Sequence, residues 1–308
     1  MKIFSSSAVI MMVCGALATV NGMPSAADAT AHPAGVIEST RQALETARGR
    51  QQRYRLFVDL ARAYAATGNY DKALDAGQQA IALIPRKEDA RLVVAQVYGA
   101  SELYELARQQ YLTILKDNRR SYRAQYELGR LYQRQGLTTQ AMAYFQDAMK
   151  IKQSTELQRA MSECQESAGV LDSAEAYLEQ ALAQEQRYED LLRLARLKEQ
   201  RKDYAAAEQL LAAASAVDTD RLDAYLQQGF IYLGMNDLAR AERSFCIAQE
   251  KAPQEGSIHF FRAVIAFRRG DIAEAMRQNA EAMWLSKSEI LTAYTYKFSY
   301  FLASRKKK

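Results

Sequence analysis

The sequence predicts an all-α solenoid of about seven helical hairpins with capping helices at its N- and C-terminal ends. The main observation is a row of seven alanines at nearly constant spacing: Ala73, Ala107, Ala141, Ala174, Ala207, Ala241 and Ala275. A second row follows seven residues later: Ala80, Ile114, Ala148, Ala181, Ala214, Ala248 and Ala282. Every step in both rows is 33 or 34 residues. A period of about 34 residues is typical of stacked helix pairs.

One period shows how each hairpin is built. Apolar residues at Phe57, Leu60, Ala61 and Tyr64 are spaced i, i+3, i+4 and i+7, which predicts a first helix with one apolar face. Gly68 follows where the chain must turn, and Pro85 ends the second helix. The alanines of the second helix allow the two helix axes to approach closely.

The same template divides the chain. It predicts repeats near residues 54–87, 88–121, 122–154, 155–187, 188–221, 222–255 and 256–289. Ile37, Leu44 and Ala47 predict an N-terminal capping helix, and residues 290–304 predict a final one, so the solenoid spans 37–304. Caps are expected because an open solenoid end exposes apolar surface.

The best-preserved repeats carry a motif that can be read residue by residue. The third repeat has Leu128, Gly129, Tyr132, Gly136, Ala141, Phe145 and Ala148, and the sixth has Tyr225, Gly229, Tyr232, Ala241, Phe245, Ala248 and Pro253. This pattern resembles the tetratricopeptide repeat family over residues 54–289, with departures at Gln165, Lys198 and Arg262. The resemblance implies a right-handed superhelix whose groove, lined by the first helix of each repeat, binds protein segments.

The resemblance also places particular residues in that groove. Its N-terminal half would carry Arg62, Gln96, Arg123, Tyr126, Arg130 and Arg134, and its C-terminal half Phe230, Phe260, Val264 and Phe267. We expect Tyr126 to be exposed among arginines that grip an acidic or extended segment, and the apolar half to take an apolar segment. Alternatively, the arginines pair with their neighbours and helix 290–304 covers the apolar half.

The N-terminus predicts export. Lys2 precedes an apolar run of 13 residues, 8–20, which is too short to span a membrane and is followed by small residues. This pattern predicts a signal peptide over 1–22 and a flexible linker over 23–36, hence a periplasmic protein. The alternatives are an uncleaved anchor or lipidation at Cys14, either of which would leave the protein membrane-anchored and facing the periplasm.

Residues for catalysis or cofactor binding are sparse. His32 and His259 are the two histidines, and the sequence has no metal-ligand cluster and no phosphate-binding loop. Cys164 and Cys246 lie in different repeats and are not expected to form a disulfide. We therefore expect neither an enzyme nor a bound cofactor or metal.

Charge limits the choice of partners. The net charge of +5 forms no long basic stripe, so nucleic-acid binding is not expected. The basic tail 305–308 follows several aromatic residues and could touch anionic lipid or an acidic partner, although a solvated tail is the simpler interpretation.

The functional hypothesis is a non-enzymatic scaffold in the cell envelope. Exported bacterial proteins of the resembled family assist assembly of pili, secretion systems and export complexes, and we expect the same class of role here. The alternative hypothesis is a capture module, similar to a chaperone, that binds extended or unfolded polypeptides.

Overall fold

The computed structural model describes residues 33–306, and within this range every regular element is an α-helix. The helices are α2 (Pro33–Thr46), α3 (Arg50–Ala66), α4 (Tyr70–Leu83), α5 (Glu88–Ala100), α6 (Tyr104–Asp117), α7 (Tyr122–Arg134), α8 (Thr138–Ile151), α9 (Thr155–Ser167), α10 (Leu171–Gln184), α11 (Tyr188–Gln200), α12 (Tyr204–Val217), α13 (Asp223–Gly234), α14 (Leu238–Lys251), α15 (Gly256–Arg268), α16 (Ile272–Leu285) and α17 (Glu289–Lys306). The all-α repeat fold is therefore confirmed.

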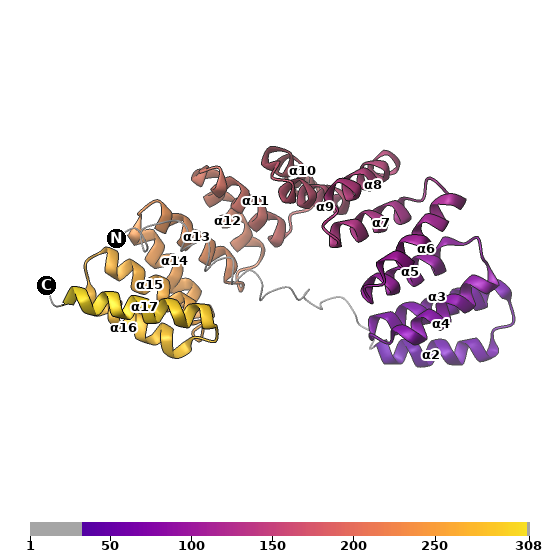
Figure 1. Cartoon of the computed structure of the whole chain (residues 1–308), viewed down its shortest axis with the longest axis horizontal. Coiled ribbons are helices and arrows are strands. Elements are labelled where there is room, and N and C mark those ends of the chain that lie inside the picture. Colours follow the sequence, from indigo (N-terminus) through magenta and orange to yellow (C-terminus); the bar gives the residue numbers. More distant parts are fainter. Residues whose placement is uncertain (1–32, 307–308) are drawn as a thin grey trace. The chain divides into compact units, whose positions relative to one another are not determined.

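The described residues form two compact units, which we call the N-terminal unit (33–184) and the C-terminal unit (185–306). In the N-terminal unit, α2 is followed by four antiparallel hairpins, α3–α4 to α9–α10. In the C-terminal unit, three hairpins, α11–α12 to α15–α16, are followed by α17 (Figure 1). Within each unit, every hairpin packs on the next one along the chain.

The alanine register marks the contacts inside the hairpins. All seven alanines of the first row have an exposed fraction of 0%, and so do the six alanines of the second row. Ile114, the single larger residue in that row, is 2% exposed. Small residues are needed here because the two helices of each hairpin lie too close for larger side chains.

The turn inside each hairpin has the same backbone conformation in all seven repeats. Gly68, Gly136, Gly169 and Gly270 have φ between 72° and 86°, which glycine adopts without steric cost. The equivalent residues of the other repeats, Glu102, Lys202 and Asn236, have φ of 61°, 63° and 59°. The repeat geometry therefore imposes a left-handed turn even where the sequence supplies a side chain that disfavours it.

Neighbouring hairpins are also joined by tyrosine hydroxyls. The backbone N–H of Ala90, at the start of α5, donates to Oη of Tyr54 at 3.3 Å. The N–H of Ala224, at the start of α13, donates to Oη of Tyr188 at 3.0 Å. The first N–H groups of a helix have no partner within it, so a tyrosine from the preceding repeat satisfies one of them.

The helix ends differ slightly from the sequence predictions. The prediction of a flexible linker over 23–36 is wrong at its end, because α2 begins at Pro33 rather than near Ile37. Proline suits the first turn of a helix, since its fixed φ is helical and its missing N–H would be unpaired there. At the other end, α17 extends to Lys306 and takes in part of the predicted tail 305–308. The predicted signal peptide 1–22 lies outside the described residues.

Candidate partner-binding surface

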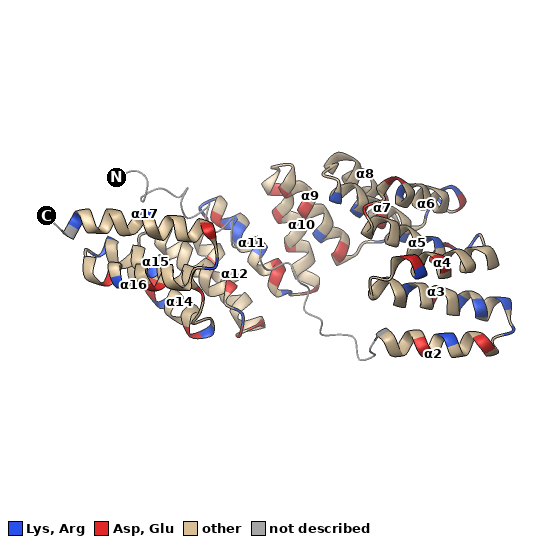
Figure 2. Cartoon of the chain, turned by 60° about the horizontal axis from the view of Figure 1, so that its bottom comes forward, with Lys and Arg blue, Asp and Glu red and all other residues tan. Residues whose placement is uncertain are grey.

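The predicted groove residues of the N-terminal unit lie on the first helices of successive hairpins, where they form polar contacts between repeats. Arg123 on α7 forms an ion pair with Asp89 on α5, with Nη1 and Oδ1 2.8 Å apart. Arg62 on α3 approaches the same carboxylate at 3.8 Å and Asp59 on its own helix at 3.6 Å. Figure 2 shows that basic and acidic residues are interspersed on the helices of this unit.

The row continues along the unit. Gln96 on α5 donates to Glu127 on α7 at 2.8 Å. Arg130 and Gln133 on α7 both donate to Oε2 of Glu163 on α9, each at 2.9 Å. Their partners lie about one repeat away, so each contact joins one hairpin to the next. We call the surface formed by these side chains on α3, α5, α7 and α9 the first-helix face.

The arginines of this face differ in their pairing. Arg62, Arg123 and Arg130 are paired with neighbours, as the alternative interpretation expected. Arg134 is exposed, and among the described residues it forms no ion pair. Its guanidinium group keeps its bidentate donor geometry available for a carboxylate from outside the chain.

Tyr126 is more buried than predicted. Its ring stacks on Tyr122, with centroids 6.3 Å apart, and tilts against Phe145 at 5.8 Å. Burial raises the pKa of its hydroxyl above the usual value of 10. The expectation of an exposed tyrosine among arginines is therefore wrong, because the phenol ring fills space between α7 and α8 and only part of it remains accessible.

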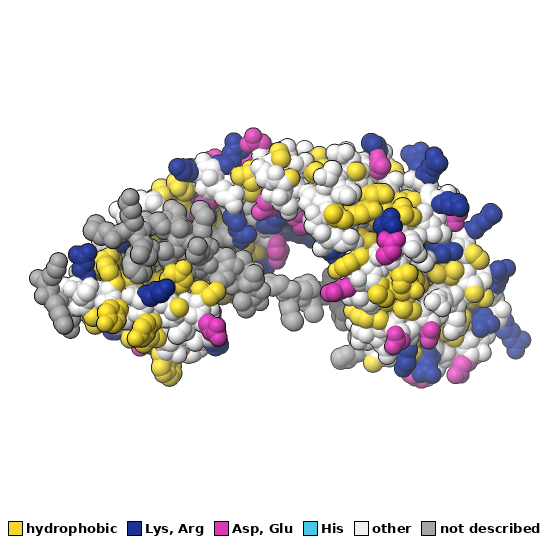
Figure 3. All heavy atoms as spheres, in the orientation of Figure 1, with side chains coloured by type: hydrophobic (Ala, Val, Ile, Leu, Met, Phe, Trp, Pro, Cys, Tyr) yellow, Lys and Arg dark blue, Asp and Glu magenta, His cyan; other side chains and the backbone are white. Residues whose placement is uncertain are grey.

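The predicted apolar half of the groove is largely core. Phe230 and Phe260 have exposed fractions of 9% and 1%, and Val264 and Phe267 are partly buried in the same cluster. The ring of Phe260 meets that of Phe298 on α17 at 5.8 Å, and Phe267 meets Phe301 at 5.2 Å. An open apolar groove at these residues is therefore wrong, and the alternative that helix 290–304 covers them describes the structure, since α17 packs its aromatic rings on those of α15. Other hydrophobic side chains remain visible over α16 and α17 (Figure 3).

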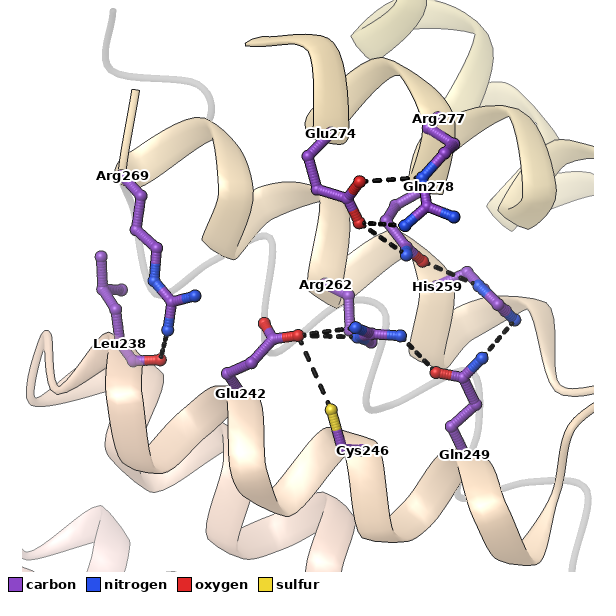
Figure 4. A network of polar contacts seen from close by, with 10 residues as sticks. All are labelled: Leu238, Glu242, Cys246, Gln249, His259, Arg262, Arg269, Glu274, Arg277 and Gln278. Carbon is purple, nitrogen blue, oxygen red and sulfur yellow. Dashed lines mark hydrogen bonds and ion pairs between the residues drawn. The ribbon is translucent and has the colours of Figure 1, made fainter. Parts of the chain in front are cut away.

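A network of polar contacts links α14, α15 and α16 (Figure 4). Arg262, one of the departures from the family motif, forms an ion pair with Glu242 at 2.8 Å and also donates to Gln249. Nδ1 of buried His259 lies 2.9 Å from Gln278, and its Nε2 lies 3.3 Å from Gln249. Arg262 thus makes a charge-assisted contact between successive hairpins, and the histidine is a packed and hydrogen-bonded residue.

Metal-ligating and thiol side chains of the described residues are the remaining candidates for chemistry. Among them, no group of three or more His, Cys, Asp or Glu side chains is arranged to hold a metal ion. Cys164 and Cys246 are both free thiols, and burial raises the pKa of Cys164 to about 11, which disfavours the reactive thiolate. No helix in this part of the chain is long and apolar enough to cross a membrane.

Comparison with known proteins identifies the repeat. The sequence model of the tetratricopeptide repeat matches residues 38–88, 94–154 and 226–283, which together make up more than half of the chain. No curated protein matches the sequence.

Solved structures agree on the fold. The C-terminal part of a tetratricopeptide repeat-containing protein from Cytophaga hutchinsonii has a TM-score of 0.65 at 14% identity, covering 77% of this chain and 98% of that one. Cut9–Hcn1 of the APC/C has a TM-score of 0.55 at 14% identity, covering 94% and 59%. A tetratricopeptide repeat protein from Parabacteroides merdae has a TM-score of 0.51 at 18% identity, covering 76% and 92%. At such identities the likeness concerns the fold alone.

Proposed function

Because the chain belongs to the tetratricopeptide repeat family, whose members bind protein partners, we propose that it is an exported, non-enzymatic scaffold of the cell envelope. In this role it assists assembly of a surface appendage, a secretion system or an export complex. It does so by holding an extended, acidic segment of a partner on the first-helix face of the N-terminal unit.

The observation that carries this proposal is the pattern of pairing on the first-helix face. Arg123, Arg130 and their acidic neighbours have side chains 36% to 47% exposed. Exposed ion pairs contribute only about 0 to 1 kcal/mol, so a partner carboxylate can replace an internal one at little cost. Arg134, with no ion pair among the described residues, requires no such exchange. The face therefore offers a line of donors that suits carboxylates spaced along an extended chain.

Export is supported by the sequence of residues 1–22, where Lys2 precedes a short apolar run and small residues. Intact-mass measurement on protein from the native host should show a chain shortened by about 22 residues. A full-length product in the cytosolic fraction would contradict export, and a lipid adduct at Cys14 would support the membrane-anchored alternative.

The direct experiment reverses one unpaired charge. The full chain, immobilised, is incubated with an envelope extract, and the proteins that the wild type retains are quantified by mass spectrometry. Arg134→Glu should reduce the retained partner roughly tenfold or more, because a charge-assisted hydrogen bond contributes about 1.5 to 3 kcal/mol. The matched control is Arg120→Glu, an exposed residue between α6 and α7, which should leave retention unchanged. Equal retention by both variants would show that the first-helix face does not bind the partner.

The same extract distinguishes the second hypothesis, a capture module for extended or unfolded polypeptides. A scaffold retains one or a few proteins at fixed stoichiometry. A capture module retains many proteins weakly and releases them to competing unfolded peptide.

A further inference from the structure

The C-terminal unit exposes large aromatic side chains that the groove hypothesis does not use. Trp284 near the end of α16 is 82% exposed, and Tyr296 and Tyr300 on α17 are 64% and 78% exposed. Ile290 at the start of α17 is 50% exposed. We call these four side chains the aromatic patch. Figure 3 shows hydrophobic side chains over both helices on one face of the C-terminal unit.

Part of the patch lies on α17, on the side opposite the one that packs on the core. Its inner side buries Leu291, Phe298 and Leu302 against the aromatic core, with exposed fractions of 7%, 0% and 0%. Tyr296 and Tyr300 are four residues apart and therefore share the opposite side of the helix. A surface helix normally carries polar residues on its outer side, whereas the outer side of α17 exposes these two tyrosines among polar residues such as Glu289 and Thr292.

The exposed charges next to the patch are more often basic than acidic. Lys287, Lys297 and Arg305 are exposed, as are the two acidic residues Glu281 and Glu289. The guanidinium of Arg305 lies 5.4 Å from the ring centroid of Phe301 and thus remains close to the helix surface. Three further lysines follow in the sequence. An occupant that accepts aromatic rings and carries negative charge would complement this surface.

We propose that the aromatic patch and the basic residues around it rest on the surface of an anionic phospholipid bilayer, with α17 lying in the plane of that surface. Tryptophan and tyrosine favour the membrane–water interface because their rings are apolar at one end and polar at the other. Lysine and arginine are attracted by anionic headgroups. Side chains that protrude this far suit a fluid surface that adapts around them, whereas a protein partner would need a matching pocket for each ring. The contact is peripheral, which agrees with the lack of a membrane-spanning helix among the described residues.

Trp284 provides a local test, because it is the single tryptophan of the chain and its fluorescence reports on the patch alone. The full chain is titrated with vesicles of phosphatidylglycerol and phosphatidylcholine, and separately with vesicles of phosphatidylcholine only. We expect a blue shift and quenching by brominated lipid with the anionic vesicles, and neither effect with the neutral ones. High salt should reverse the shift because it screens the attraction.

Variants then separate charge from ring insertion. K287Q/K297Q/R305Q should weaken anionic-vesicle binding roughly 100-fold, at about fivefold for each basic side chain removed. The control K116Q/R119Q/R120Q removes the same charge from exposed positions of the N-terminal unit and should bind like the wild type. Y296S/Y300S keeps the fluorescent probe and should also bind more weakly, with an unchanged melting temperature because both rings are exposed.

Three results would overturn the proposal. In the first, anionic vesicles leave the emission spectrum of Trp284 unchanged. In the second, neutral vesicles shift it as much as anionic ones do. In the third, the emission shifts with protein concentration in the absence of any lipid. The last would assign the patch to a second copy of the chain.

Discussion

Replacing Gly129 by alanine tests how closely the two helices of a hairpin approach. A Cβ added at Gly129 on α7 would lie 2.5, 2.6 and 3.1 Å from three ring carbons of Phe145 on α8. Carbon atoms in contact prefer about 3.5 to 4.0 Å, so helix or ring must move by roughly 1 Å. Phe145 is 0% exposed and its ring also meets Tyr126, which leaves it no free direction.

The expected magnitude follows from two opposing effects. Overpacking a close contact costs about 1 to 3 kcal/mol. Alanine favours a helix over glycine by about 1 kcal/mol, which offsets part of that cost. Gly129→Ala should therefore lower the free energy of unfolding by about 0 to 2 kcal/mol relative to the wild type, and by about 1 to 3 kcal/mol relative to a Gly→Ala substitution without the clash. Gly229→Ala should behave alike, because its added Cβ would lie 2.6 Å from the ring of Phe245.

The assay is urea unfolding of the full chain followed by circular dichroism. Gly234→Ala is the matched control, because it is also a helical glycine and its added Cβ has no atom within 4 Å. It should be neutral or slightly stabilising. Phe145→Leu in the Gly129→Ala background should recover part of the loss, as a double-mutant cycle would show. If Gly129→Ala is as stable as the control, the close approach of α7 and α8 is not a constraint and the reasoning fails.

Three further predictions concern the core. Ala141→Phe should lower the free energy of unfolding by about 1 to 3 kcal/mol, measured by thermal unfolding. Gln146→Ala, an exposed position on the same helix, should change it by less than about 0.5 kcal/mol. Equal effects at both positions would refute the predicted register of the alanine rows. Burial raises the pKa of Tyr188 to about 12 from 10.0, so its contribution to stability is complete below pH 10 and is lost as the pH rises toward 12. Unfolding of Tyr188→Phe should depend less on pH in that window, and an unchanged pH dependence would argue against burial of the hydroxyl. In the folded chain an alkylating reagent should modify partly exposed Cys246 before buried Cys164, and peptide mass mapping would measure both rates. Equal rates would contradict the burial of Cys164 in the fourth hairpin, α9–α10.

The repeat register was accessible from the sequence because it rests on local chemistry. Alanine at nearly every hairpin contact and glycine at most turns are direct consequences of close helix packing and of positive φ. The turns at Glu102, Lys202 and Asn236 could have been predicted from the period alone, since they lie 33 or 34 residues from the neighbouring turns. Propensity alone does not indicate them, because the hairpin as a whole enforces the conformation.

The candidate surface was harder to predict because pairing depends on side chains one repeat apart. The sequence placed Arg123 and Arg130 on the first-helix face, but their partners Asp89 and Glu163 emerge only when successive hairpins are stacked. Phe260 posed a similar problem. Its position in the repeat motif predicts that Phe260 lines the groove. In the structure Phe260 is buried instead, because α17 folds back over α15.

Site-specific photo-cross-linking in living cells tests the central claim, that a partner binds the first-helix face of the N-terminal unit. A photoreactive residue replaces either Gln96 on that face or Gln146 on α8, both of which are exposed. Cross-linking from Gln96 should give one or a few discrete adducts in the envelope fraction, and Gln146 should give none. Adducts from Gln146 alone, or the same adducts from both positions, would contradict the claim.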